Sequence, residues 1–311
     1  MKKIGIILAA SLLAVLPLKA QEGPSQEDFQ KRYDLLVSKL GPTGVGIETL
    51  LTRWERAYPD DPNMLLAQFS YWFSKSQTTK VEKLDRDKYL GNAPVLPLKD
   101  SLGNKTNFFE VHYFDDEMYG KASKALDKVI ALAPDQLDYR LLKANALISY
   151  EKESPDMALS YLKGLIDYHF HNHPTWKYPG IEMDANAFDA LMQEYCFAFF
   201  KLGCPGGYDA FRELSEKMLQ YESKNTLFLT NLGTWELVAH KDPNAAMKQY
   251  TKVLKMKPGD YTVLKNIILL ARSEKNIKLE KKYLPQLIKA TSDETERASY
   301  EVRLKSLAGK S

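Results

Sequence analysis

The stretch YGKASKALDKVIALA, residues 119–133, decides the fold of this chain. Its apolar residues, including Ala122, Leu126 and Val129, recur every three to four positions and so predict one buried face of an amphipathic helix. Pro134 follows directly and stops that helix. Strand-like runs are scarce elsewhere in the 311-residue chain. The sequence therefore predicts an all-α protein.

Further helix starts and stops follow at short intervals on both sides of this stretch. Caps and breakers predict helices over residues 138–150, 154–169 and 241–257. A small residue followed four positions later by a bulky one recurs in them, with separations of 36, 52 and 36 residues between the small residues. Such pairs suit closely crossing helices, because the small side chain lets one helix approach the other. The pairs are Ala122/Leu126, Ala158/Leu162, Ala210/Leu214 and Ala246/Tyr250.

The stretch Asn231-Leu232-Gly233, followed by Ala246, Tyr250 and Pro258, resembles the tetratricopeptide-repeat (TPR) family, with one extra residue in the turn. The resemblance covers residues 115–310, and residues 25–77 by helical pattern alone. The first helix of the pair is missing directly before Ala122, where another segment takes its place. The resemblance implies a right-handed TPR-like solenoid of twelve or thirteen helices, which binds ligands in the concave groove of its first helices. The groove positions that it implies are Gln68, Tyr71, Asn145, Thr234, Lys265 and Arg272.

Two segments interrupt the repeats. Residues 78–114 contain turn signals and the aromatic run 107–113, which predicts a small β-hairpin insertion. Residues 169–184 contain two prolines together with Trp176 and Tyr178. The predicted organisation is a signal peptide (1–20), N-terminal helices (21–77), the insertion (78–114) and TPR-like repeats (115–311).

The first twenty residues have the pattern of a cleaved signal peptide. Lys2 and Lys3 precede an apolar run over residues 4–16, and Ala20 is a plausible cleavage point. That run is too short to span a bilayer, so no transmembrane segment is expected. We expect a periplasmic or secreted protein.

Charge is unevenly distributed along the chain. Without residues 1–20 the chain carries 40 basic and 40 acidic residues, which does not favour nucleic-acid binding. Residues 241–311 carry 16 basic and 8 acidic residues, or +8, so residues 21–240 carry −8. Lys265 and Arg272 are seven positions apart in the basic part, and together they are expected to hold a carboxylate or phosphate of an anionic protein or peptide partner.

A metal-dependent enzyme is a weaker alternative. His169, His171 and His173 alternate and would converge on a metal ion in an extended conformation, although a helix end followed by Pro174 explains the same residues. His112 lies among acidic neighbours, which fits a polar strand edge better than a general base. No nucleotide-binding, hydrolase or metalloprotease motif occurs. We therefore expect no cofactor, no metal and no enzymatic activity.

The aromatic insertions support another alternative, a glycan- or small-ligand-binding protein that uses Trp176 and Tyr178, with Phe108 and Tyr113. The expected function remains binding of a protein or peptide by a non-enzymatic scaffold. The two cysteines, Cys196 and Cys204, are eight positions apart, about 12 Å along a helix, and so are expected to be free thiols rather than a disulfide.

Overall fold

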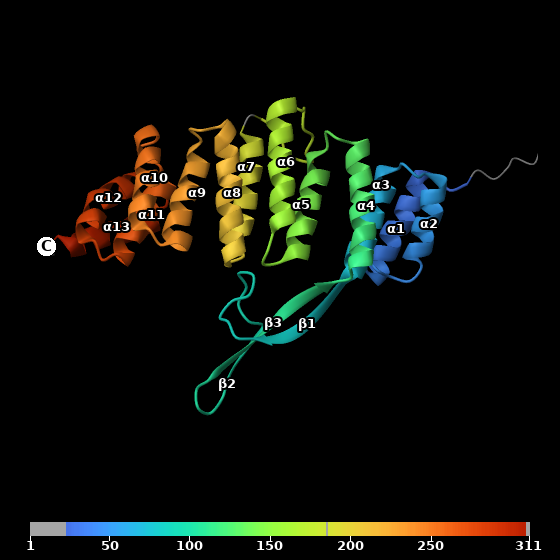
Figure 1. Cartoon of the computed structure of the whole chain (residues 1–311), viewed down its shortest axis with the longest axis horizontal. Helices are drawn as coiled ribbons and strands as arrows, with labels where there is room; N and C mark the ends of the chain where they lie inside the picture. Colours follow the sequence, from blue (N-terminus) through green and yellow to red (C-terminus); the bar gives the residue numbers. More distant parts are fainter. Residues whose placement is uncertain (1–22, 185, 309–311) are drawn as a thin grey trace, which may run out of the picture.

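The computed structural model describes residues 23–184 and 186–308. Within them it contains thirteen α-helices and one three-stranded sheet. The helices stand side by side in a long row that runs from α1 to α13, and most helices adjacent in the chain pack against each other (Figure 1). The chain is an all-α helical-repeat solenoid with a small β insertion, as the sequence predicts.

The helices form six successive pairs, and α13 (Glu294–Leu307) ends the row. The first helices of the pairs are α1 (Gln26–Leu40), α3 (Pro62–Ser76), α5 (Leu137–Glu151), α7 (Ala187–Lys201), α9 (Thr226–Trp235) and α11 (Tyr261–Ser273). The second helices are α2 (Ile47–Ala57), α4 (Asp116–Leu132), α6 (Asp156–Asn172), α8 (Pro205–Tyr221), α10 (Pro243–Met256) and α12 (Ile277–Ala290). Helix α9 continues into one π-helical segment, Glu236–His240.

Side-chain caps and prolines fix where the helices begin. Asp61 accepts the backbone N–H of Asn63 at the start of α3, and Asp242 accepts those of Asn244 and Ala245 at the start of α10. Both helices and α8 carry proline at their first turn, where its missing N–H leaves no hydrogen bond unmade. Local sequence signals therefore set the spacing of the row.

The four recurring alanines lie on the second helices of successive pairs and are at most 2% exposed. They are Ala122, Ala158, Ala210 and Ala246. Their burial agrees with the predicted place in close helix crossings. At the α9–α10 crossing, the small residue on the facing helix is Gly233, and a Cβ atom there would lie 2.5 Å from the ring of Tyr250.

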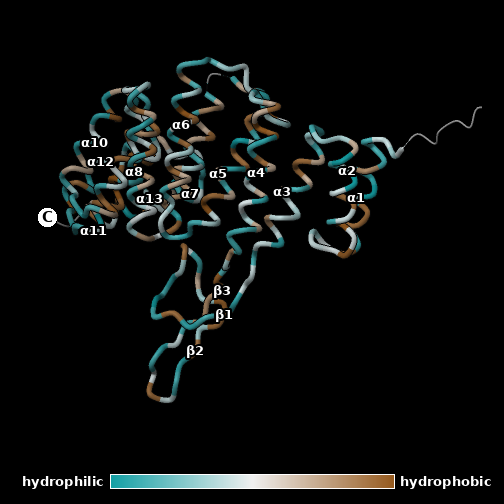
Figure 2. The backbone as a smooth tube through the Cα atoms, turned by 45° about the vertical axis from the view of Figure 1, so that its right-hand side comes forward, coloured by the Kyte–Doolittle hydropathy of each residue, from teal (hydrophilic) through white to brown (hydrophobic). Residues whose placement is uncertain are grey.

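The core follows the row as three hydrophobic clusters, formed mainly by α1–α4, α5–α8 and α9–α13. Trp54 is fully buried in the first cluster, and its indole N–H donates to Asp61 at 2.9 Å. The hydropathy colouring in Figure 2 shows apolar segments recurring from helix to helix along the row. Each pair thus buries its apolar face on its neighbours, as in other solenoids.

Residues 77–114 form an arm that projects from one edge of the row (Figure 1). It contains β1 (Gln77–Leu84), β2 (Leu96–Lys99) and β3 (Lys105–Phe114), antiparallel and in the order β1-β3-β2. The sheet has three strands rather than the two of a hairpin, since β3 pairs on both edges. The arm connects α3 to α4, and these two helices pack against each other. Helix α3 is therefore the first helix of the pair that contains Ala122, which the repeat pattern in the sequence did not assign.

The second predicted break lies between α6 and α7. Helix α6 runs three residues past His169 to Asn172, and His173 takes a left-handed conformation at its C-terminus (φ 45°). The following segment packs on the start of α5 through a parallel bridge between Lys177 and Gln136. The predicted signal peptide lies outside the described residues. Among the described helices, none combines the length and apolar character needed to cross a membrane.

Candidate functional site

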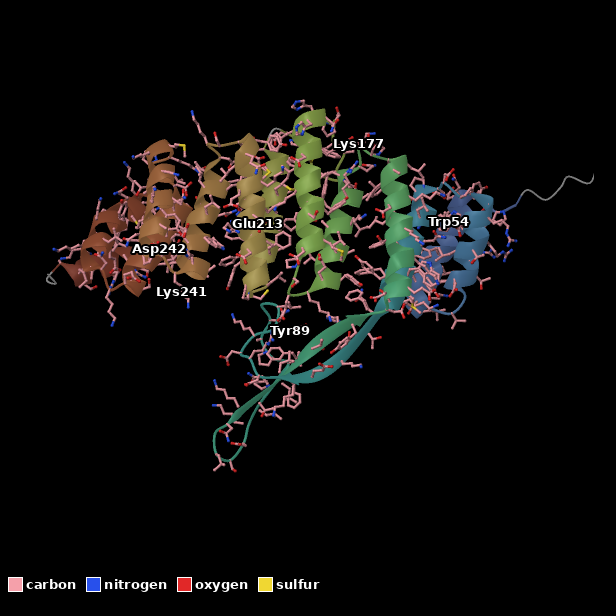
Figure 3. The ribbon with its side chains drawn as sticks, in the orientation of Figure 1. Trp54, Tyr89, Lys177, Glu213, Lys241 and Asp242 are labelled. Atoms are coloured by element: carbon pink, nitrogen blue, oxygen red, sulfur yellow. The ribbon has the colours of Figure 1, made fainter. Side chains whose placement is uncertain are left out.

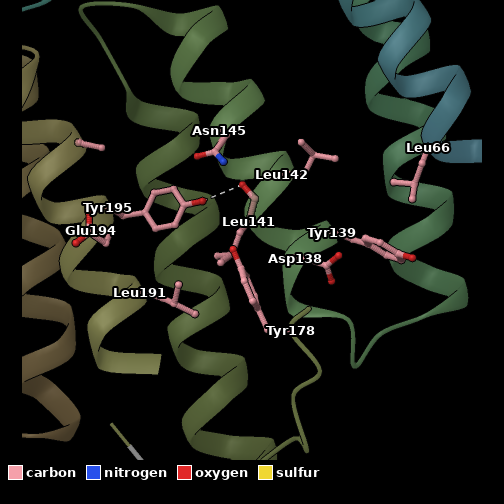
Figure 4. Close-up of a pocket in the computed structure, with 11 residues that line it drawn as sticks. Leu66, Asp138, Tyr139, Leu141, Leu142, Asn145, Tyr178, Leu191, Glu194 and Tyr195 are labelled. Atoms are coloured by element: carbon pink, nitrogen blue, oxygen red, sulfur yellow. Dashed lines mark hydrogen bonds between the residues drawn. The ribbon is translucent and has the colours of Figure 1, made fainter. Parts of the chain in front are cut away.

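Two open hollows lie on the face formed by the first helices, and we call this surface the first-helix face. Hollow 1 has a volume of about 580 Å³ and lies between α5 and α7, with α3 at its edge (Figure 4). Its lining residues are Leu66, Asp138, Tyr139, Leu141, Leu142, Asn145, Tyr178, Leu191, Glu194, Tyr195 and Ala198.

Hollow 1 combines apolar and tyrosine walls with two carboxylates. Figure 4 shows Asp138 between the rings of Tyr139 and Tyr178. Burial raises the pKa of Asp138 above its ordinary value, and its Oδ1 atom is buried without a hydrogen-bond partner. The Tyr195 hydroxyl donates to the Leu141 carbonyl at 2.9 Å, which fixes one wall.

Hollow 2 has a volume of about 430 Å³ and lies between α7, α9 and α11. Two large apolar side chains at it, Phe197 and Leu227, are 47% and 45% exposed. Hydroxyl and amide groups surround them. The residues lining this hollow are Gln193, Phe197, Phe200, Phe211, Thr226, Leu227, Thr230, Asn231, Thr234, Lys257, Asp260, Tyr261, Thr262 and Asn266.

A polar network forms the floor of hollow 2. Gln193 on α7 and Asn231 on α9 exchange hydrogen bonds of 3.0 and 2.7 Å through their amides. Asn266 on α11 donates to the Thr234 hydroxyl at 3.3 Å. Because these bonds join three first helices, they fix the relative positions of the walls. They also satisfy the buried amide of Asn231.

The groove positions implied by the TPR resemblance divide between the hollows and the interior. Asn145 lines hollow 1 and Thr234 lines hollow 2. Gln68 is half-buried and lies at neither hollow. Tyr71 is buried, and its hydroxyl donates to Glu48 of α2 at 2.7 Å. Tyr71 therefore faces the preceding pair rather than the first-helix face.

Lys265 and Arg272 do not form a joint site for an external anion. Lys265 pairs with Glu296 of α13 at 2.9 Å, and Arg272 donates to Glu280 of α12 at 2.8 Å. Glu280 is 2% exposed and also accepts from Arg303 of α13. Both cations thus hold carboxylates of the chain itself, so the expected anion clamp is corrected to a contact that fastens the last helices.

The aromatic residues of the 173–186 segment have different roles. Trp176 is 7% exposed, and its indole N–H donates to His169 Nδ1 at 2.9 Å, so it belongs to the core. Tyr178, two residues later, lines hollow 1. Phe108 and Tyr113 lie on the arm, outside either hollow. The four aromatic residues proposed for glycan binding therefore do not form one surface.

The three alternating histidines do not converge. The His169 ring stacks on Phe188 with 3.8 Å between centroids, and burial lowers its pKa. His171 lies 2.7 Å from the Asp167 carbonyl, and His173 is exposed at the helix end. The helix continues through this stretch, so alternate residues do not share a side. Within the described residues, no group of three or more His, Cys, Asp or Glu is placed to hold a metal ion.

The two cysteines are free thiols. Cys196 is buried in α7, where burial raises its pKa to about 12, so its reactive thiolate form is disfavoured. Cys204 lies at the start of α8, with its sulfur 3.5 Å from the Glu153 carbonyl oxygen.

Most residues of the hollows were not predicted from the sequence. The signal that would have found some of them is helical spacing: Asp138 and Leu142 precede Asn145 by seven and three positions and share its face. On α7, Leu191, Glu194 and Ala198 follow the same spacing beside the buried stripe. The hollows are lined by the row of helically spaced residues next to the buried row on each first helix, and not by the most apolar row.

Comparisons with known proteins do not identify this chain. The chain matches no known family model and no curated protein. A solved structure to which it is similar is the crystal structure of the flexible tandem repeat domain of a bacterial cellulose synthase component. The two are 14% identical, the match covers 92% of this chain and 98% of that chain, and the TM-score is 0.25. A likeness at this level identifies neither a ligand nor a role.

Proposed function

We propose that this chain is a non-enzymatic binding protein that holds an extended segment of a protein partner along its first-helix face. The position of the two hollows carries the proposal. They lie on either side of α7 on the same face, and both are open to solvent. An extended polypeptide that crosses α7 would fill both hollows, whereas a small ligand would occupy only one.

The chemistry of hollow 2 suits a polypeptide. The exposed Phe197 and Leu227 offer apolar contact to side chains of the partner. Thr226, Thr262 and Asn266 offer hydroxyl and amide groups, which both donate and accept hydrogen bonds and so suit a main chain. The Gln193–Asn231 pair holds this surface rigid, which lowers the entropy cost of binding.

The proposal extends to family and location. The buried recurring alanines and the 36-residue spacing support a distant relationship with TPR proteins. The pattern of residues 1–20 supports export, which N-terminal sequencing of the protein recovered from culture medium or periplasm would test. Intramolecular partners for His169, His171 and His112 support a role without catalysis.

The test selects peptides from a random 12-residue display library on the full chain and measures their affinity by fluorescence anisotropy. Leu227→Asp places a charge in hollow 2 and is expected to weaken selected peptides about tenfold or more. Leu132→Asp is the matched control, since Leu132 is 47% exposed on α4 and lies at neither hollow. Equal affinities for wild type and Leu227→Asp would contradict the proposal.

A sugar panel tests the glycan alternative in the same protein. Thermal stabilisation by oligosaccharides but not by selected peptides would replace the proposed function with glycan binding. Tyr178→Ala then distinguishes hollow 1 from other surfaces, because Tyr178 is the residue of the 173–186 segment that reaches it.

A further inference from the structure

Hollow 1 differs from hollow 2 in its charge. Hollow 2 is lined by Lys257 and Asp260, which pair with each other at 3.1 Å. Hollow 1 is lined by two acids, Asp138 and Glu194, and by no basic residue. Within the described residues, neither acid pairs with a lysine, arginine or histidine. The hollow therefore presents negative charge that the chain does not neutralise.

Asp138 lines the hollow from the start of α5, where backbone N–H groups also face its carboxyl group. It is half-buried at the start of α5, and its Oδ1 atom has no hydrogen-bond partner. Burial raises the pKa of this carboxyl and so disfavours its charged form, and a cationic group brought next to its accessible side would offset that cost. Glu194, exposed on α7, adds a second negative charge at the same hollow.

The walls of the hollow suit the carbon stem of a long cationic side chain. Leu66, Leu142 and Leu191 offer aliphatic contact, as lysine and arginine stems prefer. The rings of Tyr139 and Tyr178 stand beside Asp138 and can face a cation (Figure 4). The volume of about 580 Å³ exceeds what a bare ion needs.

We propose that hollow 1 binds a lysine or arginine side chain of the partner polypeptide. This proposal rests on the proposed function, since it assigns the charge class of the segment held on the first-helix face. The net charge of −8 over residues 21–240 supports it by attracting a basic segment to this part of the row. The inference reverses the expectation of an anionic partner. The two cations on which that expectation depended, Lys265 and Arg272, already pair with Glu296 and Glu280 of the chain itself.

The test measures the affinity of a selected lysine-containing peptide and of the same peptide with acetyl-lysine, which keeps the stem and loses the charge. For wild type we expect acetylation to weaken binding about tenfold or more. The double variant Asp138→Asn/Glu194→Gln should weaken the lysine peptide similarly and leave the acetylated peptide unchanged. The control Asp209→Asn/Glu301→Gln removes the same charge at exposed positions of α8 and α13 and should change neither affinity by more than about twofold.

A second probe tests the cation subsite of hollow 1 separately from peptide binding on the first-helix face. N-acetyl-lysine amide, followed by saturation-transfer difference NMR, reports the subsite without a peptide. Signals in wild type that vanish in Asp138→Asn/Glu194→Gln would support the subsite even if no library peptide bound. Peptides that depend on Leu227 but bind wild type and the double variant equally would overturn the subsite and leave the proposed function standing. Neutral oligosaccharides bound through Tyr178 would overturn it as well.

Discussion

The missing side chain of Gly233 decides how closely α9 and α10 approach. Gly233 lies against the ring of Tyr250, which is fully buried. A methyl group there would lie 2.5 Å from the ring, well inside contact distance. The same sequence position carries the resemblance to TPR proteins, so the family pattern and the packing have one physical cause.

We expect Gly233→Ala to destabilise the protein. The overlap with Tyr250 should cost about 1–3 kcal/mol, more than the gain in helix propensity of about 1 kcal/mol. Gly164→Ala is the control, because Gly164 lies in α6 with nothing within 4 Å of its added Cβ. Urea unfolding should show a loss for Gly233→Ala and no loss for Gly164→Ala. An unchanged free energy of unfolding for Gly233→Ala would contradict this prediction and mean that α9 and α10 can move apart at little cost.

Asp189 gives the stability a dependence on pH. Burial, and then its hydrogen bond with Glu222, raise the pKa of Asp189 to about 7, although Asn225 donates to it at 2.9 Å. Between about pH 4 and pH 7 the folded state keeps this proton and the unfolded state does not. Stability contributed by the protonated form is therefore lost as the pH rises to 7 and changes no further above it.

The variant Asp189→Asn keeps the shape and lacks the charge. The free energy of unfolding of the variant minus that of wild type should be larger at pH 8 than at pH 5 by about 1–2 kcal/mol, since only the wild type loses stability over this range. Denaturant titrations at the two pH values measure this difference. Asp209→Asn, at an exposed position of α8, serves as the comparison and should show little pH dependence relative to wild type. A constant offset of Asp189→Asn across this range would contradict the assignment.

At the scale of elements, the sequence predicted individual helices better than it predicted which elements pack or pair with each other. The helix predicted from residues 119–133 is α4, Asp116–Leu132, because an N-cap, an apolar stripe and a final proline all lie within it or at its ends. The third strand, β2, was missed as a separate element: its four residues are all exposed, so no alternating buried pattern signals it. Helix α3 was not recognised as the partner of α4, since residues 77–115, which include the arm, separate them.

The site residues show the same limit. Asn145 and Thr234 lie at the hollows because their places on first helices follow from the repeat. Lys265 and Arg272 occupy comparable helical positions, yet α12 and α13 bring Glu280 and Glu296 against them. Spacing within one helix states which side chains share a face. It cannot state which charges a later helix places opposite them, and tertiary packing decides whether a cation is available.

At the scale of the whole molecule, the arm is held at two places. Its strands leave the row between α3 and α4, and its loop over residues 85–95 returns to the ends of later helices (Figure 3). Arg86 pairs with Glu153 after α5, and Gly91 lies against the Lys201 carbonyl at the end of α7. The buried arm residues Phe109 and Val111 belong to none of the three core clusters. The position of the arm therefore depends on these few contacts rather than on the core.

Gly91→Ala should release the loop without unfolding the row. Its Cβ would lie 2.0 Å from the Lys201 carbonyl oxygen, and φ at Gly91 is +78°. Limited trypsin cleavage at the exposed Arg86 and Lys88 should rise several-fold, while the Tm of the protein stays nearly constant, because the loop opens independently of the helices. Gly103→Ala shares the backbone strain, with φ +84°, but meets nothing within 4 Å and should leave cleavage at these two residues unchanged. If the two variants are cleaved alike, backbone strain and not the contact with α7 determines how the arm is held.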